Sequence, residues 1–326
     1  MTRLTCDGII GWRRMLSIDI ITVSRETIVG EDVLPEARIC DYEGSTYRTD
    51  FWEGRGREYE DLAERVAIRS LLPPRGSRVV DVGAGFGRLA SLYAGYDEVV
   101  LLDYSQSQLE YARQQLGDER FVYVAADIYR LPLADAVVDA AVMVRVLHHL
   151  EDVPTAFEHL ARALAPDGVF VLEFANKRHL KNILRWALRR GSNPFDRAPL
   201  QFADLHFDFH PRWAIERLGD QQLEVMAQRS VSLLRSTWLK QRLSPQTLAA
   251  VDAAQQRLLA WAYLAPSVFV ASRKPGEALA ALPARSGLFR CPDCGAQPLA
   301  LVDEGASCDA CGRLWPLING VYCFKG

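Results

Sequence analysis

The chain has 326 residues, of which 49% are hydrophobic and 24% are charged, so its length predicts two domains and its composition excludes wholesale disorder. A formal net charge of −3 disfavours a protein that coats nucleic acid. No run of about 18 apolar residues is present, and Arg13 and Arg14 interrupt the early apolar stretch, so we expect no membrane span, no secretory signal and a cytoplasmic protein.

The first part of the chain carries weak signals. Up to residue 46 the only candidate strand is 18–23, and Met15 is a second candidate start codon. From residue 47 to 72 apolar residues recur with helical spacing, and Pro73 and Pro74 end this pattern.

Strands and helices then alternate. Near-continuous apolar runs predict strands at 78–82, 98–103, 121–124, 137–144 and 169–174. Helices are predicted from Gly87, at 105–116 with Ser105 as N-cap, and at 153–164. This alternation is typical of an α/β fold with a doubly wound, Rossmann-like parallel sheet that helices cover on both faces.

A basic amphipathic segment interrupts the alternation at 177–190. It has lysines and arginines but no acidic residue, and one helical stripe holds Leu180, Ile183, Leu184, Ala187 and Leu188. Such a helix can dock on anionic lipid, grip phosphate or cover a site with its apolar face. We expect it to border the substrate site, with surface contact through 177–190 as an alternative. Strands at 223–225 and 267–272 and a helical stretch at 246–264 follow.

A glycine-rich turn follows the first predicted strand of the sheet. Gly83, Gly85 and Gly87 let the backbone turn sharply and let a ligand approach. Asp103 ends the next strand, where a carboxylate accepts hydrogen bonds from ribose hydroxyls. The dinucleotide fingerprint wants glycine at position 88, which is arginine, and Asp81 can hold a cationic amine. The residues therefore favour a cofactor in which a nucleoside is joined to an amino acid, and they disfavour NAD. The alternative is that the turn has a purely structural role.

Four motifs resemble those of class I methyltransferases that use S-adenosylmethionine (SAM). They occur in the family's order and spacing at 79–87, 101–105, 125–133 and 137–150. The last of these is similar to the quinone-biosynthesis-like, type 11 branch. The resemblance covers roughly 55–275 and implies a SAM-dependent methyltransferase, but it does not specify the acceptor, because this branch methylates small molecules, lipids, quinones and macromolecules.

The resemblance implies roles on the methionine side of the cofactor. The three glycines give close backbone approach, and Asp81 orients the methionine amine. Arg145 and Val146, after the fourth strand, contact the methionine part.

It also implies roles on the adenosine side. Asp103 binds both ribose hydroxyls, with Tyr104 beside the adenine. Asp127 accepts a hydrogen bond from the adenine amino group, and Ile128 packs on the ring. A helix N-cap is the alternative role for Asp127.

Methyl transfer from a sulfonium is an in-line displacement, for which a protein mainly supplies alignment and a dry pocket. A base is needed only when the acceptor is protonated. The candidate catalytic residues are His148, His149, His206 and His210. The first two follow the fourth strand and have a cap or packing role as the alternative. Alternation places the last two on one face with Asp204 and Asp208 if 204–210 is extended; a hydrogen-bonded loop or a metal site are the alternatives.

Four of the seven cysteines form two Cys-x-x-Cys pairs near the end of the sequence. They are Cys291, Cys294, Cys308 and Cys311, each pair being followed by a glycine. This spacing predicts one structural Zn²⁺ with four thiolates in a reducing compartment, rather than a disulfide scaffold. Cys323 is not expected to be a ligand.

Residues 287–326 resemble the zinc-ribbon activator subunit of certain methyltransferases, a small protein that partners enzymes acting on tRNA, rRNA and release factors. This implies activation in cis, by shielding an apolar patch or shaping the site. The predicted organisation is an N-terminal extension at 1–46, a methyltransferase domain at 47–275, a linker at 276–286 and a small C-terminal zinc ribbon at 287–326.

The sequence therefore predicts a SAM-dependent methyltransferase with a small-molecule or lipid-like acceptor. One alternative is an rRNA, tRNA or protein methyltransferase that uses the ribbon for recognition, which the acidic ribbon disfavours. A non-catalytic SAM-binding regulator is another. No protein partner is identified.

Overall fold

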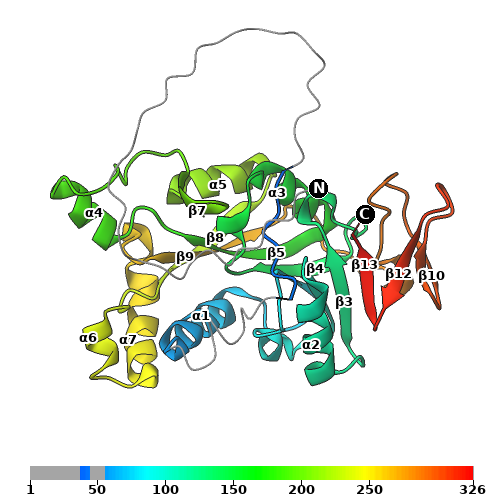
Figure 1. The fold of residues 1–326 in the computed structure, drawn as a ribbon, viewed down its shortest axis with the longest axis horizontal. Helices are drawn as coiled ribbons and strands as arrows, with labels where there is room; N and C mark the ends of the chain where they lie inside the picture. Colours follow the sequence, from blue (N-terminus) through cyan, green and yellow to red (C-terminus); the bar gives the residue numbers. More distant parts are fainter. Residues whose placement is uncertain (1–36, 45–55, 326) are drawn as a thin grey trace, which may run out of the picture.

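The computed structural model describes residues 37–44 and 56–325. The candidate strand at 18–23 and the start of the helical pattern at residue 47 lie outside these residues. An eleven-stranded sheet has the order β10-β11-β12-β13-β3-β2-β1-β4-β5-β9-β8, and a two-stranded sheet pairs β6 with β7 (Figure 1).

The strands are β1 Gly76–Val82, β2 Tyr96–Asp103, β3 Phe121–Ala126, β4 Val138–Met143, β5 Leu164–Ala175, β6 Leu200–Ala203, β7 His206–Asp208, β8 Glu224–Val231, β9 Ser267–Arg273, β10 Ala300–Val302, β11 Gly305–Ser307, β12 Leu314–Ile318 and β13 Val321–Phe324. The α-helices are α1 Glu58–Leu71, α2 Gln106–Leu116, α3 Val153–Ala163, α4 Leu180–Ala187, α5 Pro211–Asp220, α6 Thr237–Lys240 and α7 Pro245–Leu258. Short 3-10 helices are η2 Ala90–Tyr93, η3 Ile128–Arg130, η4 Leu147–His149, η5 Ala260–Ala262 and η6 Arg285–Gly287.

The predicted doubly wound sheet is confirmed. Strands β3, β2, β1, β4 and β5 pair in parallel, and β9 and β8 complete that side antiparallel. Helices α1 and α2 bury Ala63 and Leu109 on one face, while α3 and α5 bury Phe157 and Leu218 on the other (Figure 1). Helices shield both faces of the sheet from solvent, which explains why the strands are near-continuous apolar runs in the sequence.

Most helix boundaries follow local signals, and one prediction is wrong. Ser105 caps α2 by accepting a hydrogen bond from the Gln108 backbone N–H, as predicted. The helix expected from Gly87 does not form there; the chain continues in turns and makes only the short η2. The cause is local, because Gly87 has φ +79°, which lies outside the right-handed helical region.

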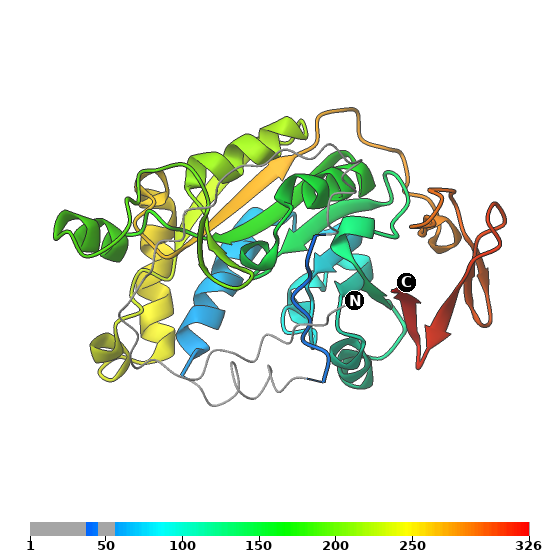
Figure 2. The ribbon, with the colours of Figure 1, turned by 45° about the horizontal axis from the view of Figure 1, so that its top comes forward.

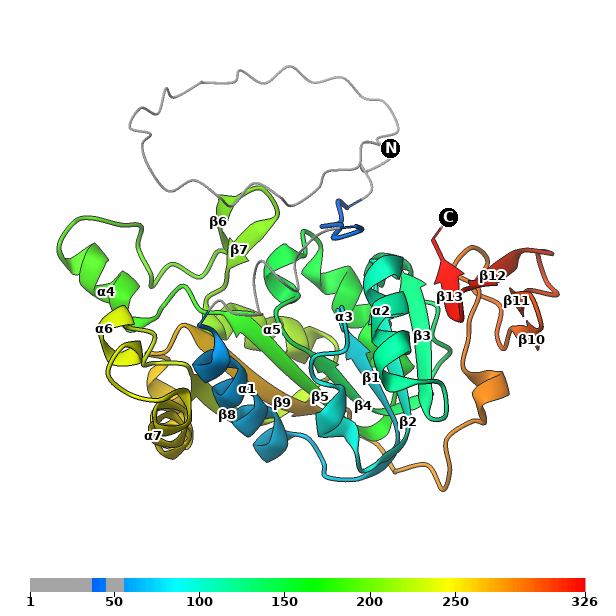
Figure 3. The ribbon, with the colours of Figure 1, turned by 60° about the horizontal axis from the view of Figure 1, so that its bottom comes forward.

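The C-terminal module extends the main sheet. Strand β13 pairs in parallel with β3, from Val321 opposite Tyr123 to Phe324 opposite Ala126 (Figure 3). A core shared with the first domain contains Phe289, Trp315 and Phe324 of the module. The module is therefore joined to the first domain by backbone hydrogen bonds as well as by apolar contact, which the sequence did not predict.

At the opposite end of the molecule, α4 extends from the domain beyond β5 (Figure 2). It covers the central part of the predicted basic segment at 177–190, and none of its residues is buried. Among the described helices, none is long and apolar enough to span a membrane.

Candidate functional site

A cavity opens at the carboxyl end of β1, where β2 and β4 lie on either side of it. Nine of the predicted site residues line it: Asp81, Gly83, Gly85, Asp103, Tyr104, Ile128, Arg145, Val146 and His149. Gly87, Asp127, His148, His206 and His210 are not among its lining residues. Most of the predicted cofactor residues are thus brought together, and the predicted histidines are divided.

The glycine turn is held by backbone hydrogen bonds and needs its glycines. Gly83 has φ +73°, and its N–H donates to the Leu102 carbonyl at 2.7 Å. A Cβ at Gly83 would lie 2.1 Å from Cγ2 of Val146, which itself lines the cavity. A Cβ at Gly85, where φ is +52°, would meet only Asp103 Oδ2 at 3.9 Å. The turn therefore leaves an open surface at Gly85 that a bound group can approach.

Asp103 ends β2 and is fixed by the backbone around it. Its Oδ2 accepts the Gly85 N–H at 2.7 Å, and its Oδ1 accepts the Ser105 N–H at 2.8 Å. Burial raises the pKa of this carboxyl, although these two N–H donors oppose the shift. The carboxylate thus joins the glycine turn to the start of α2 at the cavity wall.

Asp81 is the least satisfied polar group in the cavity wall. It lies in β1 and is 2% exposed, and its Oδ2 has no hydrogen-bond partner among the described residues. Burial raises the pKa of Asp81 to about 7. Tyr93 and Arg88 offset this shift only in part, and a buried carboxylate oxygen without a donor is costly unless a ligand supplies a donor or a positive charge.

Arg145 has a strained backbone that buried carboxylates hold in place. Its φ is +62°, and its N–H donates to Glu173 Oε2 at 2.9 Å. Its guanidinium donates to Glu64 Oε1 through Nε at 2.9 Å. Glu64 is 0% exposed and also pairs with Arg88 at 2.9 Å. Although burial opposes the shift, the two arginines hold the pKa of Glu64 below its usual value.

On the other side of the cavity, Asp127 and Ile128 have different roles. Ile128 lines the cavity. Asp127 is the N-cap of η3, where its Oδ1 accepts the Tyr129 N–H at 2.7 Å. Asp127 thus has the N-cap role given as the alternative, and its contact with the adenine amino group stays a prediction.

Three of the predicted histidines form a cluster beside the cavity. The ring centroids of His149 and His148 are 4.0 Å apart, and those of His149 and His206 are 4.7 Å apart. His149 Nδ1 lies 3.0 Å from the Leu205 carbonyl, which can only accept, so Nδ1 carries the proton. Its Nε2 then accepts from the Tyr42 hydroxyl at 3.2 Å. Burial lowers the pKa of His149 to about 4, so the ring is neutral near pH 7.

The one-sided arrangement that depended on an extended 204–210 does not form. Leu205 has φ +46°, so the segment turns there and is extended only in β7. Asp204 is exposed and pairs with Arg38 at 2.8 Å, whereas His210 is the N-cap of α5 and accepts the Arg212 N–H at Nδ1. These four residues do not share a face, and among the described residues the only cluster with metal-ligating spacing is that of the cysteines.

Three residues of the site were missed from the sequence. Glu64 is charged but faces the sheet from α1, and Tyr42 reaches His149 from a segment with no periodic signal. Lys325 follows β13, and its Nζ lies 4.5 Å from the centroid of the Tyr104 ring and 3.6 Å from Glu43 Oε2. Each contact joins segments far apart in the chain, so no local pattern could have revealed it.

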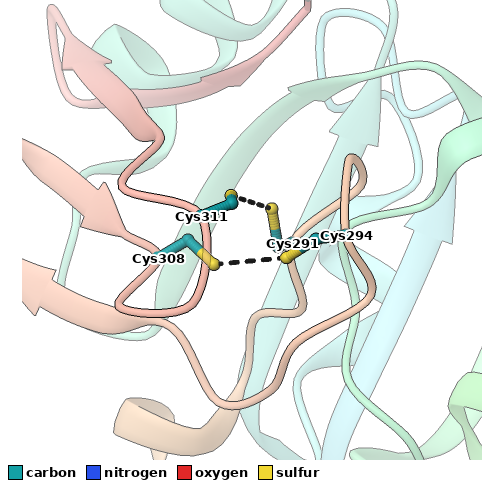
Figure 4. Close-up of side chains that lie close together, drawn as sticks. All are labelled: Cys291, Cys294, Cys308 and Cys311. Atoms are coloured by element: carbon teal, nitrogen blue, oxygen red, sulfur yellow. Dashed lines mark hydrogen bonds between the residues drawn. The ribbon is translucent and has the colours of Figure 1, made fainter.

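The four cysteines converge as predicted (Figure 4). Their Sγ atoms all lie within 4.8 Å of one another, with 3.7 Å between Cys291 and Cys311 and 3.5 Å between Cys294 and Cys308. Tetrahedral zinc with bonds of about 2.3 Å places its sulfur ligands about 3.8 Å apart. The donor set and its geometry therefore fit a four-thiolate zinc ion with no open position.

Comparisons with known proteins agree with the central part of this site. Residues 80–172 match the family model of a methyltransferase domain. The chain is 30% identical over 146 residues to the O-methyltransferase cnsE of Penicillium expansum, covering 41% of this chain and 52% of that protein. It is 35% identical over 119 residues to a demethylmenaquinone methyltransferase of Clavibacter sepedonicus, covering 35% of this chain and 49% of that protein. The chain thus spans about half the length of these curated relatives.

A solved structure shares the fold. A SAM-dependent methyltransferase from Mesorhizobium loti superposes with a TM-score of 0.50 and 21% identity, covering 65% of this chain and 97% of that one. These similarities support a class I methyltransferase domain with a Rossmann-like sheet. The family match ends at residue 172 and does not include the cysteine module.

Proposed function

We propose that this protein is a SAM-dependent methyltransferase that acts on a small-molecule or lipid-like acceptor. The observation that carries the proposal is the cavity wall formed by the glycine turn, Asp103 and Asp81, whose Oδ2 has no hydrogen-bond partner among the described residues. A buried carboxylate with one oxygen that lacks a donor, beside a turn open at Gly85, suits a ligand with an ammonium group and a ribose. The similarity of residues 80–172 to methyltransferase domains supports the same cofactor.

Each wall of the cavity then has a role. Asp81 accepts the ammonium group of the methionine part, and Arg145 and Val146 border that part from the end of β4. Asp103 accepts the ribose hydroxyls, while Tyr104 and Ile128 hold the adenine between them. When bound, SAM supplies an electrophilic methyl group, and the protein aligns the acceptor and excludes water.

The acceptor is proposed from the relatives and from the histidine cluster. One relative is named as a demethylmenaquinone methyltransferase and another as an O-methyltransferase, which suggests a hydroxyl or quinone-type acceptor. The neutral His149 can take up a proton through the Tyr42 hydroxyl. A base with a low pKa suffices, because an acceptor oxygen becomes strongly acidic as its bond to the methyl group forms.

We further propose that residues 287–326 are a zinc ribbon, joined through a linker at 276–286 to a methyltransferase domain at 47–275. The four cysteines would hold the metal in a purely structural role. The module acts on the domain in cis: Arg130 of η3 pairs with Asp293, and η3 begins with the cavity residue Ile128. The zinc would thereby stabilise one wall of the cofactor cavity.

The proposal is tested with the purified full-length chain. Calorimetry should detect binding of SAM and S-adenosylhomocysteine but not of NAD or ATP. Methyl-labelled SAM is then incubated with the protein and a fractionated lysate, and label should enter the small-molecule or lipid fraction. Label in RNA or protein would refute the acceptor class, binding without transfer would indicate a regulator, and preference for NAD would refute the cofactor.

The affinity for SAM should depend on pH through Asp81. Its folded pKa of about 7 lies above the ordinary value, so the carboxyl is neutral in acid and ionises as the pH rises. If only the carboxylate binds the ammonium group, affinity rises roughly tenfold from about pH 5.5 to about pH 7, a range in which an α-amine stays protonated. Calorimetry across this range measures it.

The Asp81→Asn variant separates this effect from other titrations. Its affinity for SAM should be low and should not change with pH. A raised folded pKa means that Asp81 favours the folded state only while it is protonated, and this contribution is lost as the pH rises toward 7. D81N without ligand should therefore unfold at a higher temperature than the wild type above pH 7. An unchanged pH dependence of affinity in D81N would contradict the role of Asp81.

Replacing His149 should slow methyl transfer without weakening cofactor binding. His149→Asn keeps a donor for the Leu205 carbonyl but removes the acceptor at Nε2, so kcat should fall by about 100-fold or more. His210→Asn is the matched control, because His210 caps α5 outside the cavity and asparagine preserves a cap. Equal kcat values in both variants would remove His149 from catalysis. The rates are measured on the acceptor found in the labelling screen.

A further inference from the structure

Helix α4 exposes its apolar stripe. Leu184 and Leu188 are 54% and 66% exposed, and Leu180 and Trp186 are also exposed. Among the described residues, none covers this stripe, and no residue of α4 lines the cofactor cavity. A helix face that is exposed to solvent normally carries polar residues, so this stripe indicates an apolar binding partner.

Further apolar side chains are exposed in the segments beside the start of α4. The Leu180 N–H donates to the Leu264 carbonyl at 2.9 Å, so α4 begins beside the residues that follow α7. The guanidinium of Arg178 lies over the rings of both Phe195 and Tyr263, which joins the loop after α4 to the same place. Near it, Leu258 and Trp261 are 71% and 78% exposed. We call the exposed apolar residues the α4 surface: Leu180, Leu184, Trp186, Leu188, Phe195, Leu258 and Trp261.

The charges at 177–190 and at 253–264 have one sign. Lys181, Arg185, Arg189 and Arg190 are all exposed, and no acidic residue occurs at 177–190 or at 253–264. Of the nearest acids in sequence, Asp252 is 0% exposed, whereas Asp196 is exposed beside Phe195 and lies 4.0 Å from Lys177. Long cationic side chains beside leucine and tryptophan are the composition of helices that lie in a membrane interface.

We propose that the α4 surface docks this protein on an anionic lipid bilayer. A bilayer offers both parts of the required partner, since its acyl region takes up leucine and tryptophan while its phosphates bind lysine and arginine. A second copy of this chain fits poorly, because a two-fold contact would bring the same cations face to face. Nucleic acid would pair with the charges but leave the leucines in water. The inference does not depend on the proposed methyl transfer.

Vesicle co-sedimentation of the full chain tests the proposal. The wild type should sediment with vesicles of equimolar phosphatidylcholine and phosphatidylglycerol and stay in solution with phosphatidylcholine alone. Arg185→Glu with Arg189→Glu should lower the partition coefficient by at least about tenfold, since each surface cation contributes about a factor of five. Leu184→Ser with Leu188→Ser should also lower it, which shows that charge alone is insufficient.

The matched control is Arg69→Glu with Arg75→Glu. Both arginines are exposed, at the end of α1 and before β1, and the double variant changes the net charge as the α4 variant does. It should bind vesicles like the wild type. The proposal is overturned if the wild type binds both kinds of vesicle equally, or if the control loses as much binding as the α4 variant. It is also overturned if sedimentation shows a dimer that dissociates in the leucine variant. Circular dichroism and SAM binding verify that each variant is folded.

Discussion

Replacing Gly83 with alanine should abolish measurable SAM binding, an effect of at least about 100-fold on affinity. Alanine at φ +73° is in the left-handed region, which costs about 1–2 kcal/mol. Its Cβ would also lie 2.1 Å from Cγ2 of Val146, so the turn or the end of β4 must shift. Both segments line the cavity, and the shift would therefore displace the walls that hold the cofactor. Calorimetry with SAM measures the loss.

Two further variants separate strain from collision. Gly117→Ala also places alanine at a positive φ, +75°, but its Cβ meets nothing within 4 Å, so it should lower stability and leave SAM affinity intact. In G83A/V146A the colliding methyl group is gone, and affinity should partly recover relative to G83A. Wild-type affinity in G83A, or no recovery in the double variant, would contradict the described geometry.

The Cys308→Ser variant should destabilise the whole protein rather than the C-terminal module alone. Cys308 is buried in the core that both parts share. A structural zinc contributes on the order of 10 kcal/mol in small domains. Because about 1 kcal/mol moves the unfolding midpoint by about 2–4 °C in a domain of this size, the midpoint should fall by at least about 10 °C. Scanning calorimetry and metal analysis measure the two effects.

Cys323→Ser is the control for thiol chemistry. Cys323 is buried in β13 and donates to Gln106 Oε1 at 3.2 Å, outside the cysteine cluster. This variant should keep one zinc per chain and lose only a few degrees. Two separate unfolding transitions in the wild type, or a Cys308→Ser protein with normal zinc content, would contradict a zinc-stabilised common core.

Local sequence patterns predicted the parts of the fold whose causes are local. Strands such as β1 and β4 are covered on both faces, so most of their residues must be apolar. The glycines at 83 and 85 were recognised because a sharp turn after a strand, with positive φ, favours glycine. The cysteine cluster was recognised because each pair makes its own turn, with the Gly295 N–H donating to the Cys291 carbonyl and that of Gly312 to the Cys308 carbonyl.

The sequence failed where distant segments decide the outcome. Nothing near 321–324 indicates that β3 is its partner, since any short apolar run can pair with an open edge. The alternation at 204–210 predicted one face, but the single left-handed residue Leu205 breaks it. From the sequence, Glu64 is expected to be a solvent-exposed residue of α1. Its burial is possible because ion pairs with Arg88 and Arg145, from other loops, offset the cost of desolvating its carboxylate.

The β3–β13 pairing has a consequence during biosynthesis. Every other strand of the sheet leaves the ribosome before β13, so the nascent domain must wait with β3 as an open edge until residue 324 has emerged. An open edge recruits strands from other chains. We therefore expect a premature stop codon between β9 and β13 to yield a product that has every strand bordering the cavity yet an uncovered sheet edge, and that chaperones and proteases would bind.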